Sequence, residues 1–153
     1  DEMLEQRALD KRIIRNQKKV WAIRENAMMI DITRRHEQSS FAEFIANWPA
    51  DNITGLWLYL KKHGCRLGGN TGPYALRTLG KDTFLFTRDV EGYLREHEIV
   101  ETGITTRSAL ANAQRFFNDL QQSSGRSLTE LSQLVSLSHG ENRAGVRTRE
   151  PDR

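Results

Sequence analysis

The chain has 153 residues, of which 37% are hydrophobic and 28% charged, with a net charge of +3 and one cysteine. This length suffices for one domain with a buried core, and no stretch approaches the roughly 18 apolar residues of a membrane-spanning helix. The lone Cys65 excludes an internal disulfide and a cysteine-rich zinc site, and it suits a reducing compartment. We therefore expect a cytoplasmic protein with no membrane segment.

The positive charge is concentrated in two segments. Residues 11–24 contain six lysines or arginines and no acid, whereas residues 61–95 contain seven against three acids. The remainder of the chain is net acidic as a consequence. Such clustering favours a surface that faces a polyanion, although a basic stretch is also typical of an ordinary solvated helix face.

Helical periodicity and capping residues predict an all-α fold. Residues 2–9 are typical of the end of a helix, and Asn16 can cap a long helix that runs to about His36. The side chains expected to pack from this helix are Val20, Trp21, Ile23, Ala27, Met28, Met29, Ile30 and Ile32.

Further along the chain, Ser39 or Ser40 can cap a short helix that ends near Trp48. Residues 82–86 form a short apolar run without a partner run elsewhere, which predicts a buried connector rather than a strand. The remaining helices are expected at 53–63, at 73–79, after Thr87, at 106–122 and after the capping box at residues 127–130. We expect one helical domain over residues 1–140 and a disordered polar tail over 141–153.

A tight turn is predicted between the two helices of residues 54–80, because residues 64–72 contain four glycines. The N–H groups that open the second helix form a natural phosphate site. This arrangement predicts that the turn binds a nucleic-acid backbone. The alternative is an ordinary helix-turn-helix corner whose basic residues are only solvated. The basic residues that flank the turn are Lys61, Lys62, Arg66, Arg77 and Lys81.

Asp89 is the candidate catalytic residue, because it falls in the first turn of the helix that Thr87 caps. The helix dipole stabilises a carboxylate there, and such a carboxylate could stabilise a sugar cation or activate water beside a bound strand. The alternative is an acid with only a capping role. The four histidines show no metal-ligand spacing among themselves.

Residues 60–80, LKKHGCRLGGNTGPYALRTLG, resemble the helix-hairpin-helix segment of the bacterial DNA-3-methyladenine glycosylase I family. The resemblance extends upstream through residues 13–16, Lys19 and residues 25–27, and downstream through LSQLVSLSHGEN, so it covers residues 1 to about 142. The matching positions in the hairpin, without a gap, are Lys61, Lys62, Gly64, Leu67, Gly69, Thr71 and Tyr74.

This resemblance implies an all-helical DNA-glycosylase-like domain that acts in base-excision repair. Its partner would be double-stranded DNA with alkylated bases, and its reaction would be hydrolysis of the N-glycosidic bond of purines such as 3-methyladenine after base flipping. It implies a catalytic role for Asp89, and a monovalent cation could bind carbonyls of the turn. The expected DNA-binding residues are Lys61, Lys62, Arg66, Gly68, Gly69, Asn70, Thr71, Gly72 and Tyr74.

Two departures from the family pattern change what we expect of metal binding and of activity. Val90 and Leu94 stand where well-studied members carry a zinc-binding His and Cys, so we expect no zinc and no other cofactor. The chain also begins inside the family's sequence, so we expect it to bind DNA but to excise bases poorly on its own. The alternatives are a non-catalytic helix-hairpin-helix DNA-binding module and a helical interaction domain with no nucleic-acid role.

Overall fold

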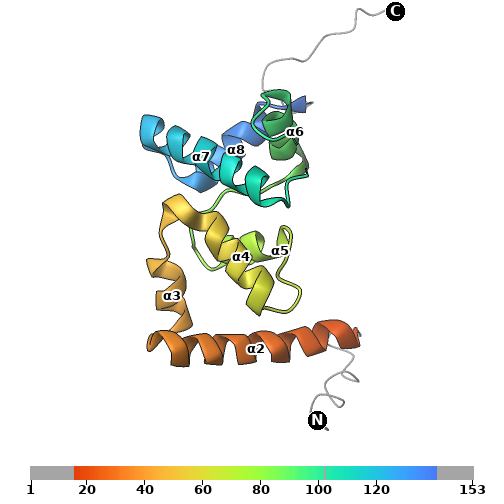
Figure 1. The fold of residues 1–153 in the computed structure, drawn as a ribbon, viewed down its shortest axis with the longest axis vertical. Helices are drawn as coiled ribbons and strands as arrows, with labels where there is room; N and C mark the ends of the chain where they lie inside the picture. Colours follow the sequence, from red (N-terminus) through yellow and green to blue (C-terminus); the bar gives the residue numbers. More distant parts are fainter. Residues whose placement is uncertain (1–15, 102, 141–153) are drawn as a thin grey trace, which may run out of the picture.

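The computed structural model describes residues 16–101 and 103–140, and every regular element within them is helical (Figure 1). The predicted all-α class is therefore confirmed for this part of the chain. The helix expected at residues 2–9 and the tail at 141–153 lie outside the described residues. The elements are α2 (Gln17–Glu37), α3 (Phe41–Asn47), the 3₁₀ turn η1 (Ala50–Asn52), α4 (Ile53–His63), α5 (Thr71–Thr78), α6 (Arg88–Glu96), α7 (Arg107–Ser124) and α8 (Leu128–Leu137).

Side-chain caps begin the helices where the sequence predicts them. Asn16 Oδ1 accepts a hydrogen bond from the backbone N–H of Lys19 at 3.2 Å. Of the two serines considered for α3, Ser40 is the cap, and Thr87 and Ser127 cap α6 and α8. Each cap supplies an acceptor for an N–H group that the first helical turn leaves without one, which is why local sequence sets these starts.

The core surrounds α4 and the connector at residues 82–86. The Trp57 indole N–H donates to Thr83 Oγ1 at 3.1 Å, and the Phe84 ring stacks on Phe117 with centroids 4.2 Å apart. Residues 83–86 are all buried, so the predicted buried connector is confirmed. Other fully or almost fully buried members of the core are Ile53, Leu56, Leu60, Leu76, Val90, Leu94 and Leu128.

The same connector holds the C-terminal helices. The Asp82 carboxylate accepts hydrogen bonds from the backbone N–H groups of Leu128 and Thr129, both at 2.8 Å. Ser132 Oγ accepts a third bond from the backbone N–H of Leu85 at 3.0 Å. Because a carboxylate at a helix N-terminus is favoured by the helix dipole, these contacts fix the start of α8 against the chain that follows α5.

α2 turns a different face toward the core from the predicted one. Ile23 and Ile30 of the expected stripe are 66% and 39% exposed, whereas Thr33, which was not expected to pack, is 2% exposed. Trp21, Met28 and Ile32 are also exposed, and of the side chains expected to pack Val20 and Met29 are buried. The predicted helix face was therefore wrong, although the expected burial of Val20 and Met29 is confirmed.

The cause is that apolar residues occur on several sides of α2, so periodicity alone could not select one. Polar contacts select it in the folded chain. Thr33 Oγ1 lies 2.7 Å from the Tyr59 hydroxyl of α4, and it also bonds the carbonyl of Met29 at 2.8 Å. A buried threonine is stable only when its hydroxyl is satisfied, so this contact fixes the rotation of α2 about its axis.

Candidate nucleic-acid interface

A close turn at residues 64–70 joins α4 to α5, and two glycines make it possible. A Cβ on Gly64 would lie 2.8 Å from the Leu60 carbonyl oxygen, and a Cβ on Gly72 would lie 2.6 Å from the Leu67 carbonyl oxygen. Neither contact is sterically tolerable against backbone. The glycine-rich turn predicted at this place is therefore present. Glycine is needed at both positions because each lies too close to a backbone carbonyl oxygen to carry a side chain.

Gly69 differs from these two glycines because nothing crowds it. It has a φ of +58°, and a Cβ there would meet no atom within 4 Å. Within the described residues, no hydrogen bond takes up the backbone N–H of Gly68, Gly69 or Asn70. These donors lie at the N-terminal end of α5, where the helix dipole favours an anion.

Three of the five basic residues that flank the turn in sequence remain exposed: Lys61, Lys62 and Arg66. The other two serve the fold. The Arg77 guanidinium donates to the Thr83 carbonyl at 2.7 Å, and the Lys81 ammonium donates to two carbonyls at the end of α3, Ala46 at 3.0 Å and Trp48 at 2.6 Å. Desolvation lowers the pKa of both Arg77 and Lys81.

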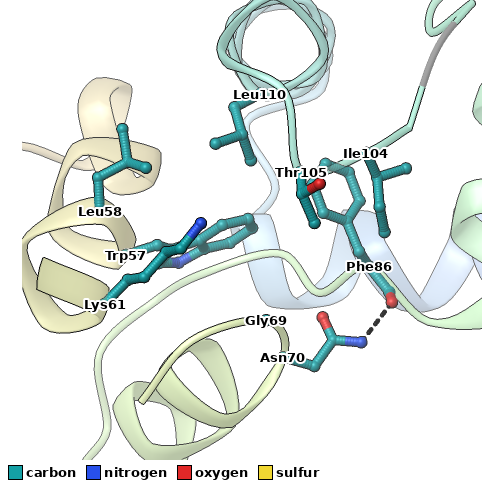
Figure 2. A pocket seen from close by; sticks show the side chains of 9 residues that line it. All are labelled: Trp57, Leu58, Lys61, Gly69, Asn70, Phe86, Ile104, Thr105 and Leu110. Atoms are coloured by element: carbon teal, nitrogen blue, oxygen red, sulfur yellow. Dashed lines mark hydrogen bonds between the residues drawn. The ribbon is translucent and has the colours of Figure 1, made fainter. Parts of the chain in front are cut away.

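Residues that open α5 connect the turn to the core. The Asn70 amide donates to the Phe86 carbonyl at 2.6 Å, as Figure 2 shows, so this side chain holds the turn on the connector. Thr71 is exposed at the first position of α5, Tyr74 is 49% exposed one turn later, and Gly72 is buried. Of these predicted site residues, Thr71 and Tyr74 are accessible to a ligand, whereas Gly72 shapes the turn.

Sequence reasoning did not assign a role to Asn26, which holds α2 against the turn. Asn26 Oδ1 accepts from the backbone N–H of Cys65 at 2.7 Å, and its Nδ2 donates to the Cys65 carbonyl at 3.1 Å. The side-chain amide of Asn26 therefore satisfies both the N–H and the carbonyl of Cys65, as a neighbouring β-strand would do for a residue in a sheet. An asparagine in the middle of a long helix, where its propensity is poor, was the available signal.

A cavity of about 130 Å³ lies beside the turn. In Figure 2, Lys61 extends from α4 along the Trp57 ring, and Asn70 approaches from the opposite side. The walls are largely apolar, and the polar side chains among them are Lys61, Asn70 and Thr105. The lining residues are Trp57, Leu58, Lys61, Gly69, Asn70, Phe86, Ile104, Thr105 and Leu110.

Asp89 lies in the first turn of α6 but does not line that cavity. It borders a separate, open depression of about 680 Å³ with residues of α6 and with His139 and Gly140, which follow α8. Ser136 Oγ donates to Asp89 Oδ2 at 3.3 Å. Asp89 is connected to the turn only indirectly. Asn70 of the turn donates a hydrogen bond to the Phe86 carbonyl, and the next residue, Thr87, caps the helix that carries Asp89.

Other expectations concern metals and membranes. Among the described residues, no group of three or more His, Cys, Asp or Glu side chains is arranged to hold a metal ion. The absence of zinc nevertheless stays a prediction, as does the monovalent cation. No helix in the described part of the chain has the length and apolar character needed to cross a membrane.

Comparisons of the chain with protein-family models, with curated proteins and with solved structures each give no match.

Proposed function

We propose that the chain binds the sugar-phosphate backbone of duplex DNA through the turn at residues 64–70, as a helix-hairpin-helix motif. The observation that carries this proposal is Gly69, with open space around it and a backbone N–H that no described residue uses. Lys61, Lys62 and Arg66 supply exposed positive charge on either side. Backbone donors and long cations contact phosphates without reading bases, so the binding is independent of sequence.

We further propose that this binding serves a DNA glycosylase of the 3-methyladenine type, with Asp89 as the catalytic carboxylate. The resemblance of residues 60–80 supports this function. In the reaction, a carboxylate stabilises the sugar cation that develops as the N-glycosidic bond breaks, and it can activate the water that completes hydrolysis. The Ser136 hydroxyl orients one carboxylate oxygen of Asp89.

One observation favours the alternative of a non-catalytic DNA-binding module. The cavity beside the turn and the depression beside Asp89 have no lining residue in common. No single cavity therefore connects a nucleotide held at Gly69 to the Asp89 carboxylate in the described part of the chain. A glycosylase and a non-catalytic module are expected to have the same DNA affinity, but only the glycosylase is expected to release free base.

The first experiment measures DNA affinity as a function of salt, by fluorescence anisotropy with a labelled duplex. We expect a Kd of roughly 1–100 μM for random sequence at physiological salt, with log K falling linearly with log salt. Replacing Lys61 and Lys62 with glutamine should reduce the slope by about 1.8, since each phosphate contact contributes about 0.9. Arg115→Gln with Arg126→Gln, two exposed arginines on α7 and just after it, is the matched control. Equal slopes for the lysine variant and this control would contradict the proposed interface.

The second experiment measures release of free base from methylated duplex DNA at saturating protein. Asp89→Asn should slow release by roughly a hundredfold, because it removes the charge that stabilises the transition state. DNA affinity should change less than twofold. Asp119→Asn, an exposed acid of α7 that lines neither the cavity nor the depression, is the control and should keep the parental rate. Release by this chain is expected to be slow but faster than from DNA without protein. A parental rate no higher than that background would favour the non-catalytic module, and equal rates above background for Asp89→Asn and the parent would exclude a catalytic role for Asp89.

A further inference from the structure

Two hydrogen bonds between Asn26 and Cys65 fix the position of α2 relative to the turn. Arg66, an exposed residue of the proposed DNA interface, follows Cys65 in the chain. A bidentate contact between a side-chain amide and a peptide group fixes both distance and orientation. Any side chain on the same face of α2 is therefore held at a set position relative to the turn.

Lys19 shares the face of Asn26. The two residues are seven apart, which is close to two helical turns, so Lys19 lies roughly 10 Å from Asn26 along the axis, toward the N-terminus. Lys18 precedes it, and both side chains are exposed. Figure 1 shows this end of α2 on the same side of the molecule as the loop that joins α4 to α5.

The charge at this end of α2 is unfavourable for the isolated helix. The first turn of α2 contains no acid, and it carries Lys18 and Lys19 instead. Cations there oppose the positive end of the helix dipole. No carboxylate of α2 precedes Glu25, so the positive potential is not neutralised within the first two turns.

We propose that Lys18 and Lys19 form a second contact with the DNA backbone, which extends the interface from the turn along α2. This inference rests on the proposed function, because the turn is the first point of contact. The offset of roughly 10 Å along α2 between Lys19 and Asn26 corresponds to about three phosphates, since each strand of duplex DNA carries a phosphate about every 3.4 Å of axis. Asn26 is the positioning residue that keeps the two contacts in register.

The test is a salt titration of duplex binding with Lys18→Gln/Lys19→Gln. Glutamine keeps the helix propensity and removes the charge. We expect the slope of log K against log salt to fall by about 1.8 and the affinity at physiological salt to drop by roughly tenfold. Arg34→Gln/Arg35→Gln removes the same charge from the opposite end of the same helix, and it should leave the slope unchanged. In an Asn26→Ala background, the loss caused by the lysine changes should shrink, because α2 is then no longer held in register.

The outcomes separate this inference from the proposed function. If Lys18→Gln/Lys19→Gln keeps the parental slope while Lys61→Gln/Lys62→Gln loses slope, the second contact is wrong and the turn remains the interface. If the parent shows no salt-dependent binding, the proposed function itself fails. If the parent binds vesicles of anionic lipid as tightly as DNA, and the α2 change weakens both equally, the surface is a general polyanion site and the inference of a DNA contact is overturned.

Discussion

Gly69→Asp is expected to abolish most DNA binding while the chain stays folded. The φ of +58° at this position lies in the left-handed region, where aspartate is among the best-tolerated side chains. Its Cβ would meet no atom within 4 Å, so the substitution adds a carboxylate to open space. In the proposed binding mode that carboxylate occupies the approach of the phosphate, and like-charge contacts across an interface cost several kcal/mol. We expect affinity to fall by roughly a hundredfold or more, which corresponds to about 2.7 kcal/mol.

The matched control is Gly69→Asn, which has the same shape and the same tolerance of positive φ but no charge. It should retain most of the affinity, so the pair separates electrostatic exclusion from steric exclusion. Anisotropy at low salt measures binding, and far-ultraviolet circular dichroism with thermal melting checks the fold. Parental affinity in the aspartate variant would show that phosphates do not approach Gly69. Equal losses in both variants would show that the turn admits no side chain at all.

Gly72→Ala is expected to destabilise the fold strongly, although helix propensity alone predicts the opposite. Alanine in a helix is more favourable than glycine by about 1 kcal/mol. Here the added Cβ would lie 2.6 Å from the Leu67 carbonyl oxygen, a backbone atom in the turn that cannot rotate away. Overpacking of this kind costs about 1–3 kcal/mol, and we expect a loss near the upper end. Chemical denaturation followed by tryptophan fluorescence measures the free energy of unfolding.

Gly103→Ala is the control, since a Cβ at Gly103 would meet nothing within 4 Å and its φ is not in the left-handed region. Its free energy of unfolding should stay within about 0.5 kcal/mol of the parent. The melting temperature of Gly72→Ala should fall by roughly 6–12 °C, at 2–4 °C for each kcal/mol in a chain of this size. A Gly72→Ala protein as stable as the parent would mean that the Leu67 peptide moves at little cost and that Gly72 is not what makes the turn close.

The local signals in the sequence determined where helices begin and where the chain turns. Asn16, Thr87 and Ser127 cap the helices that they were expected to cap, because capping involves atoms only a few residues apart. The turn at residues 64–70 and the buried connector at 82–86 were likewise evident, since glycine density and an apolar run are local properties. The position of Asp89 in the first turn of α6 was also predictable, because it follows from the cap at Thr87 two residues earlier.

Tertiary structure alone decided which side chains these elements present. The buried face of α2 depends on Tyr59 and Cys65, which are distant in sequence, so an apolar pattern on several sides left it open. Lys81 lies in a basic segment yet bonds the end of α3, and only the fold brings those carbonyls to it. Asp89 faces α8 rather than the cavity beside the turn for the same reason: α8 follows it by some forty residues, and their contact is created by packing and not by spacing along the chain.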